Sequence, residues 1–176
     1  TNKSRLFKPY FVKEIDGMKI PFIGIVTEQV LANTKNEGLI GTFVDVNEAA
    51  EEVGRICNTY NAIDIDYTVL LTHIGWEEDH ELAKLLDPAW GVDVIIGGHS
   101  HTFIEKPDIV TNILIVQAGT GTDIIGHFDI TVDTKENCTK EWKWECIPID
   151  DYHCPKDTKI EEIITKYKSE TDNKYG

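Results

Sequence analysis

The sequence has little positive charge. It holds 17 lysines and arginines against 31 aspartates and glutamates, for a formal net charge of -14, and its only arginines are Arg5 and Arg55. A surface that binds the phosphates of duplex nucleic acid needs a basic stripe, and this sequence offers none. We therefore expect no nucleic-acid partner, and an anionic substrate would rely on metal cations for most of its charge neutralisation.

The sequence also lacks a long hydrophobic run. No stretch approaches the roughly 18 consecutive apolar residues that indicate a membrane-spanning helix, so we expect no membrane span. Hydrophobic residues nevertheless make up 41% of the 176 residues, which is enough for a domain with its own core. The composition predicts a folded globular chain.

No Cys-x-x-Cys pair occurs among the four cysteines, Cys57, Cys138, Cys146 and Cys154. A structural zinc ribbon or a thioredoxin-like redox motif is therefore not expected. The last three cysteines are close in the sequence, so one disulfide could form outside the cytosol. Their pairing stays open, and the alternative is that they are small buried hydrophobic residues.

The first third of the sequence predicts a hairpin and a helix. Residues 9–14 and 19–26 are rich in aromatic and β-branched residues, and the Asp16-Gly17 pair between them favours a tight turn. Residues 27–41 are polar and predict a loop. Asn47 is expected to cap a helix over residues 48–60, whose apolar face comprises Ala49, Val53, Ile56 and Tyr60.

Two apolar strands then end in histidines. Residues 67–72 lead into His73, and residues 92–96 lead through Gly97 and Gly98 into His99 and His101. The helical pattern of residues 77–86 between them indicates a right-handed crossover that joins parallel strands. Because functional groups of such sheets collect at the carboxyl ends of the strands, these histidines are expected to lie together.

The spacing of the histidine pair favours a metal site. Side chains at i and i+2 of an extended segment point the same way, so His99 and His101 would share one pocket while Ser100 faces away. The two glycines permit a sharp turn and a close approach. Neutral imidazole is the commonest metal ligand, although a single histidine after a strand is more often structural.

The remainder of the sequence predicts strands and a final helix. Residues 112–117 form an apolar strand, and the glycine-rich residues 118–121 border the histidine pocket rather than bind a dinucleotide, because a strand over 124–132 follows them instead of a helix. In residues 141–146, Trp142, Trp144 and Cys146 alternate with charged residues and are expected to face the core. Asp157 or Thr158 caps a helix whose apolar positions are Ile160, Ile163, Ile164 and Tyr167.

Several other polar residues have ordinary structural explanations. The acidic run at the start of the 77–86 helix suits the helix dipole and predicts a solvated face. The remaining histidines lack the strand and glycine context and are expected to be structural. The acidic run comprises Glu77, Glu78, Asp79 and Glu81. The remaining histidines are His80, His127 and His153. Asp64 and Asp66 are expected to be surface loop residues.

Five motifs together resemble one known family. They are residues 71–75 (Leu-Thr-His-Ile-Gly), residues 91–102 (Gly-Val-Asp-Val-Ile-Ile-Gly-Gly-His-Ser-His-Thr), residues 115–119 (Ile-Val-Gln-Ala-Gly), and residues 5–10 leading into residues 19–25. In these motifs the sequence resembles the 5′-nucleotidase branch of the calcineurin-like metallophosphoesterases over nearly its whole length. The resemblance implies an α/β fold, as part of a layered α/β/β/α sandwich.

The resemblance also implies a metal site and a reaction. His73 and His99 would ligate one divalent ion and His101 a second, zinc or manganese, in a dinuclear centre. In such centres a bridging hydroxide attacks phosphorus while both ions stabilise the developing charge. The implied activity is hydrolysis of nucleotides or related phosphate esters; which ester cannot be predicted from this sequence.

This sequence departs from the family in what it does not contain. Members carry Asp-x-His, Gly-Asp and Gly-Asn-His-Asp/Glu motifs before the segment that resembles residues 5–10, and none occurs here. The expected catalytic histidine motif is therefore absent, and this sequence names no catalytic or substrate-binding residue. Residues 1–155 are expected to be the second half of a catalytic domain, and residues 156–176 a helix and linker toward a further domain. The expected partners are that missing first half, the further domain and the substrate.

Three interpretations follow for the isolated chain. The first is an incomplete fragment of a phosphoesterase that binds metal weakly, has little or no turnover and exposes a sheet edge. The second is a non-catalytic or partner-dependent module that keeps a partial metal site. A metal-dependent amidohydrolase is disfavoured, because too few β-α units follow the histidine pair. The family implies a periplasmic, cell-surface or extracellular location.

Overall fold

The computed structural model describes residues 8–27, 44–60 and 64–175 of the chain, so the loop predicted over residues 27–41 lies almost entirely outside the described residues. Within those ranges the chain forms a six-stranded sheet in the order β1-β2-β3-β4-β6-β5 and a two-stranded sheet of β7 and β8. The elements are β1 (Tyr10–Ile15), β2 (Met18–Ile25), α2 (Val46–Tyr60), β3 (Val69–Thr72), α3 (Trp76–Leu85), η1 (Pro88–Trp90), β4 (Val94–Ile96), β5 (Asp108–Val110), β6 (Ile113–Val116), β7 (Ile124–Asp133), β8 (Cys138–Pro148) and α4 (Thr158–Tyr175).

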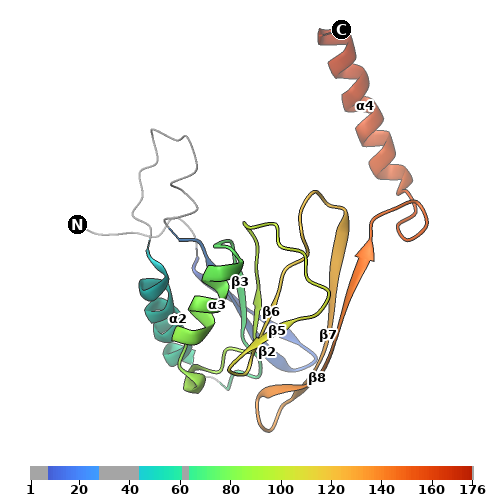
Figure 1. Ribbon diagram of the computed structural model, residues 1–176. Coiled ribbons are helices and arrows are strands. Elements are labelled where there is room, and N and C mark those ends of the chain that lie inside the picture. The colour runs from blue at the N-terminus through green and yellow to red at the C-terminus, as the bar shows by residue number, and fades with distance from the viewer. Residues whose placement is uncertain (1–7, 28–43, 61–63, 176) are drawn as a thin grey trace.

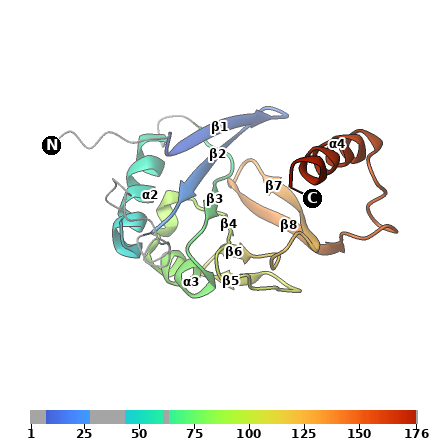
Figure 2. The ribbon, with the colours of Figure 1, turned by 90° about the horizontal axis from the view of Figure 1, so that it is seen from above.

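The two sheets and the helices form layers. Helices α2 and α3 cover one face of the six-stranded sheet, and the β7–β8 ribbon covers the other (Figures 1 and 2). A core cluster that includes Ile23, Leu70 and Ile95 packs against the helices. A second cluster, with Val69 and Val94, packs against side chains of the ribbon. The mixed α/β fold predicted from the sequence is confirmed, with three layers present in the described residues.

The predicted hairpin and crossover are confirmed. Strands β1 and β2 pair antiparallel, and the turn residues Asp16 and Gly17 have φ values of 51° and 84°. Positive φ at both central residues gives the turn whose twist matches that of the paired strands. Strands β2, β3, β4 and β6 run parallel, so the chain segments after β3 and β4 leave the sheet at the same edge.

Two local predictions about charged residues are wrong. The helix α2 begins at Val46 rather than at residue 48, and the Asp45 carboxylate, instead of Asn47, accepts a hydrogen bond from the Glu48 N–H at 2.8 Å. Asp79 was expected on a solvated face but is fully buried. In both cases the acidic side chain bonds to a neighbouring polar group, which sequence periodicity does not reveal.

The β7–β8 ribbon shows the predicted alternation. The Trp142 side chain packs against the six-stranded sheet, and the Trp144 indole donates a hydrogen bond to the Ile104 carbonyl at 3.2 Å. The Cys146 thiol donates to that same carbonyl, so these three residues share the inner face. All four cysteines are free, so none of the disulfides left open by the sequence is formed.

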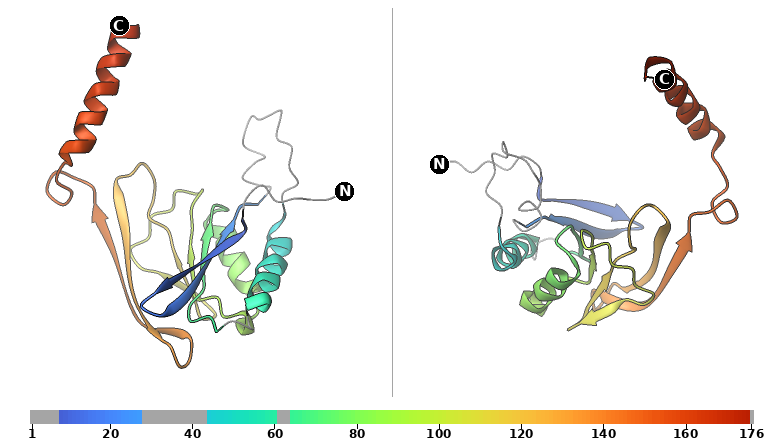
Figure 3. Two further views of the ribbon diagram at one scale, coloured as in Figure 1. Left: turned by 180° about the vertical axis from the view of Figure 1, so that it is seen from behind. Right: turned by 45° about the horizontal axis from the view of Figure 1, so that its top comes forward.

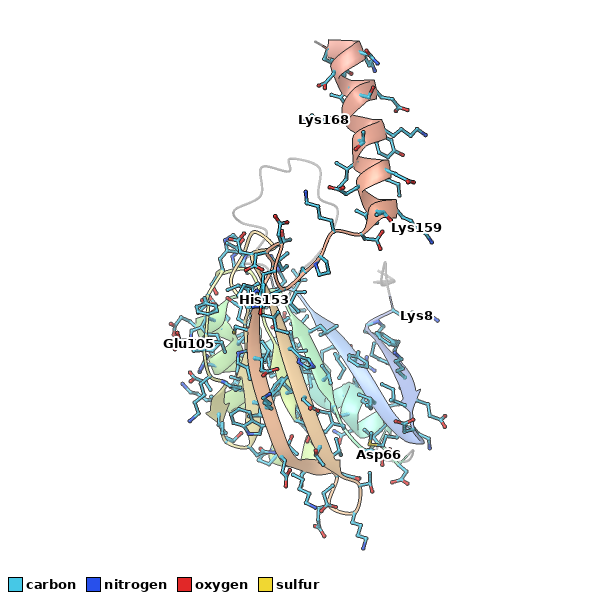
Figure 4. The ribbon with its side chains drawn as sticks, turned by 90° about the vertical axis from the view of Figure 1, so that its right-hand side faces the viewer. Lys8, Asp66, Glu105, His153, Lys159 and Lys168 are labelled. Atoms are coloured by element: carbon cyan, nitrogen blue, oxygen red, sulfur yellow. The ribbon has the colours of Figure 1, made fainter. Side chains whose placement is uncertain are left out.

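The predicted C-terminal helix is present as α4, and it stands away from both sheets (Figures 1 and 3). Its side chains extend into solvent on all sides, as the positions from Lys159 to Lys168 show in Figure 4. The apolar residues of its predicted face are 51–61% exposed: Ile160, Ile163, Ile164 and Tyr167. In the part of the chain that the structure describes, no helix is long and apolar enough to cross a membrane.

Candidate metal site

Two of the predicted ligands lie side by side. His73 directly follows β3, and its backbone N–H donates to the Ile25 carbonyl at 3.0 Å, which extends the parallel pairing by one residue. His99 lies three residues beyond the end of β4. The two imidazole rings approach edge to face, with 5.2 Å between their centroids. The sequence prediction that the adjacent strands bring these side chains together is therefore confirmed for this pair.

Glycines permit this close approach. A Cβ atom at Gly98 would lie 3.1 Å from the Nδ1 atom of His73, which is tighter than an ordinary van der Waals contact. Gly75, two residues after His73, has a φ of 108°, and a Cβ atom there would lie 3.8 Å from the His99 ring. Gly98 thus lets the two histidine segments pack against each other, whereas a side chain at Gly75 would first meet Glu78.

The geometry of the histidine pair differs from the prediction. His99 and His101 have φ values of 78° and 57°, in the left-handed region, so the expectation of an extended segment with alternating side chains is wrong. Ser100 does not face away from the sheet, because its hydroxyl donates to the Gln117 Oε1 atom at 2.9 Å. The orientation of Ser100 depends on this tertiary contact with Gln117, which no local sequence pattern indicates.

The fit to a metal ion is partial. His73 and His99 supply two adjacent imidazoles, the ligand type that zinc and manganese accept. Over residues 8–27, 44–60 and 64–175, however, no group of three or more histidine, cysteine, aspartate or glutamate side chains could hold a metal ion. The described residues thus offer half of a donor set, and the placement of His101 as a ligand stays a prediction.

Gln117 is a buried residue of this site that was not among the predicted ligands, although it lies in the 115–119 motif. It follows the wholly apolar strand β6 and is 2% exposed. Its Oε1 atom accepts hydrogen bonds from the Ser100 hydroxyl and the Thr102 N–H, and its Nε2 atom donates to the Gly98 carbonyl at 2.9 Å. Two signals in the sequence were its position in the 115–119 motif and its polarity at the end of an apolar strand.

Asp79 is the second buried polar residue near the histidines. Its Oδ1 atom accepts from the Thr72 hydroxyl at 2.6 Å, and Thr72 immediately precedes His73. Its Oδ2 atom has no hydrogen-bond partner among the described residues. Burial raises the pKa of the Asp79 carboxyl to about 6, although the Thr72 hydrogen bond opposes this shift. Through its hydrogen bond to Thr72, the Asp79 carboxyl connects α3 to the end of β3.

The other histidines have structural partners. His80 bonds to the Trp76 carbonyl at 2.7 Å and to the Asp108 carboxylate at 3.0 Å, so its structural role is confirmed. His127 and His153 lie beside surface carboxylates. In Figure 4, His153 lies where the chain leaves β8 toward α4. None of these contacts involves His73 or His99.

Comparison with known proteins finds relatives that are similar to this chain over most of its length. The chain is 31% identical over 173 residues to the trifunctional nucleotide phosphoesterase protein YfkN of Bacillus subtilis, covering 94% of this chain and 11% of that protein. It is 30% identical over 151 residues to cell wall protein Lmo0130 of Listeria monocytogenes, covering 71% of this chain and 18% of that protein. A crystal structure of the 5′-nucleotidase precursor of Thermus thermophilus superposes with a TM-score of 0.80 at 29% identity, covering 96% of this chain and 35% of that one.

No family model matches the chain. The relatives show that the chain is homologous to one part of the 5′-nucleotidases and related metallophosphoesterases. It spans between about a tenth and about a third of the length of the three proteins just compared. The resemblance predicted from the motifs is therefore confirmed, together with its fold.

Proposed function

We propose that this chain is part of a metal-dependent phosphoesterase that hydrolyses nucleotides or related phosphate esters. One observation carries the proposal: His73 and His99 lie in contact at the carboxyl ends of adjacent parallel strands, in a chain homologous to 5′-nucleotidases. Relatives named nucleotide phosphoesterase and 5′-nucleotidase support the substrate class.

The proposed metal ligands in this chain are His73 and His99 for one divalent ion and His101 for a second, and ligands outside residues 1–176 complete the two-metal centre. Bound zinc or manganese ions would supply Lewis-acid activation and neutralise charge on the phosphate. The chain itself places the two imidazoles 5.2 Å apart through their positions after β3 and β4. With two of three predicted ligands in contact, the isolated chain should bind metal weakly and turn over little substrate.

A second function is favoured by a specific observation. The described residues hold no group of three or more metal-ligating side chains that could bind an ion. A non-catalytic or partner-dependent module with a partial metal site would have this arrangement. It differs from the first proposal in what the complete protein does, since such a module would release no phosphate.

We also propose a location and a domain organisation. Residues 1–155 form the second half of a catalytic domain, and residues 156–176 lead into a further domain; the exposure of α4 along its length supports the second point. A periplasmic, cell-surface or extracellular location is supported by a relative named as a cell wall protein.

The test compares the complete protein with this chain. Each is purified and assayed for phosphate release from a nucleoside monophosphate, with zinc or manganese added and then removed by chelation. We expect metal-dependent release from the complete protein and little or none from the chain. In the complete protein, His99→Ala should lower kcat/KM by roughly 100-fold or more, because a ligand is lost.

A matched histidine supplies the control. His127 is on the outer face of β7, beside Glu145, so His127→Ala should leave kcat/KM unchanged. If the complete protein releases no phosphate with either metal, the phosphoesterase proposal is rejected and the non-catalytic module is favoured. Strong activity of the isolated chain would reject the claim that it is incomplete.

A further inference from the structure

We propose that Gln117 is a positioning residue whose buried amide sets the conformation of the loop that carries His99 and His101. The inference rests on the proposed metal site, because it concerns how the two ligand side chains are held. Gln117 has no assigned role in the proposed reaction and, at 2% exposure, it is not placed to meet a substrate.

The burial of Gln117 requires the contacts that it makes. An amide moved from water into an apolar interior without hydrogen bonds destabilises the folded state. Gln117 avoids this through two bonds accepted by Oε1, from Ser100 and Thr102, and one donated by Nε2, to Gly98. The two donors that meet Oε1 and the carbonyl that meets Nε2 also define the orientation of the amide. All three partners belong to one loop of five residues.

That loop has an unfavourable backbone. His99 and His101 both have positive φ, a conformation that is unfavourable for a residue with a side chain. Such conformations persist where the surrounding structure imposes them. Gly98, Ser100 and Thr102 alternate with the two histidines, so each histidine is flanked on both sides by a residue bonded to Gln117.

The same contacts connect the loop to His73. The Ser100 hydroxyl accepts a hydrogen bond from the Trp76 N–H at 3.0 Å, at the start of α3 and three residues after His73. A chain of hydrogen bonds therefore runs from β6 through Gln117 and Ser100 to the segment that follows His73. This connection holds the two imidazoles at their spacing before any ion binds, so binding does not have to order the loop.

The first experiment measures zinc affinity. Zn²⁺ is titrated into the whole chain while NMR follows the ring protons of the histidines. Gln117→Leu removes all three hydrogen bonds and should weaken zinc binding by roughly 10–100-fold.

The control removes a comparable bond elsewhere. The Tyr67 hydroxyl, on a residue 4% exposed, bonds to the Thr139 hydroxyl at 2.8 Å near the opposite end of β3. Tyr67→Phe should lower the melting temperature without changing zinc affinity. If Gln117→Leu does not fold, Gln117→Met, which removes the same three hydrogen bonds from a side chain of similar length, takes its place in the same comparison with Tyr67→Phe.

The second experiment needs no metal. Amide hydrogen exchange of the metal-free chain should show Thr102 protected in the wild type and exchanging at least about tenfold faster in the Gln117 variant, with Ile115 unchanged. If the wild-type chain binds no zinc, the proposed metal site is rejected, and Thr102 exchange alone decides the inference. If a folded Gln117 variant keeps both wild-type zinc affinity and wild-type Thr102 exchange, the inference is rejected and the proposed function stands.

Discussion

At the scale of single residues, the site depends on one buried carboxyl and the glycine beside it. A Cβ atom at Gly97 would clash with the Oδ2 atom of Asp79, a buried residue whose Oδ1 atom already accepts a hydrogen bond from Thr72. We predict that Gly97→Ala lowers the free energy of unfolding by about 1–3 kcal/mol, because the carboxyl cannot move away without losing that bond. Urea unfolding measures the change.

A second glycine provides the control for this prediction. Gly24 lies in β2 with no heavy atom within 4 Å of a Cβ atom placed there. Gly24→Ala should therefore be neutral or slightly stabilising, since alanine loses less conformational entropy on folding. An equal loss of stability in the two variants would contradict the role given to Asp79.

Another buried carboxyl predicts how stability varies with pH. Asp93 is 5% exposed and accepts a hydrogen bond from the Thr68 N–H at 2.7 Å. Burial raises the pKa of its carboxyl from 3.8 to about 7. Between these values the folded state binds more protons than the unfolded state, so stability is lost as pH rises through this window. The loss is on the order of 1.4 kcal/mol for each unit of the pKa difference.

The measurement is urea unfolding at pH 5 and pH 8. The wild type should be less stable at pH 8, and Asp93→Asn should reduce this difference, because the amide has no charge to bury. Part of the difference in stability between pH 5 and pH 8 should remain in this variant, because the pKa of Asp79 is also raised. Asp64→Asn, at an exposed position, should leave the difference unchanged. A pH dependence that is equal in Asp93→Asn and the wild type would refute the assignment.

Individual residues also show where prediction from sequence succeeds. His73 and His99 were predicted to meet because both follow strands that a helix connects, and this local pattern places two strand ends side by side. Asp79 was misplaced because its neighbours Glu77, Glu78 and Glu81 made the helix start look uniformly solvated. Whether one carboxyl of such a run turns inward depends on Thr72 and Gly97, which are distant in sequence.

At the scale of elements, most helices and strands were predicted, but the edge strand β5, the short helix η1 and the conformation of the loop after β4 were not. The hairpin at Asp16-Gly17 and the strand alternation of β8 follow from short-range periodicity and turn chemistry. The segment from Gly97 to Thr102 has no such pattern. Its conformation depends on contacts with Gln117 and with the start of α3, so an extended segment was predicted where positive φ values occur.

The helix α4 is an element whose existence, but not whose environment, could be predicted. Its apolar residues recur at helical spacing, which usually indicates a face packed against a core. In the structure that face is exposed and α4 lies apart from the two sheets (Figure 3). Periodicity identifies a helix but does not identify what packs against it.

At the scale of the whole molecule, apolar surface remains on the sheet face that β7 and β8 cover in part. Leu71 and Ile96 are paired neighbours in register and are each 41% exposed. They lie two residues beyond Val69 and Val94, which the ribbon does bury. At one edge of the sheet, Phe11 of β1 is 54% exposed. Such surfaces associate with other chains.

We therefore predict that the isolated chain associates with itself as its concentration rises. Sedimentation velocity over a hundredfold dilution should show the mean sedimentation coefficient falling toward that of a monomer. The double variant Leu71→Gln and Ile96→Gln should weaken association, whereas Leu85→Gln, which alters a residue of α3 with 40% exposure, should not. A compact monomer at every concentration would contradict this prediction.

The sequence by itself determined most of the strands and helices, the parallel crossover that joins β3 to β4, and the resemblance to 5′-nucleotidases that the comparisons confirmed. These properties depend on periodicity, turn residues and motif spacing, all of which are local. Only the tertiary structure decided which polar groups are buried, how the His99 loop is bent, and which apolar faces stay uncovered. Those properties depend on contacts between segments far apart in the chain, whose free energies no local pattern records.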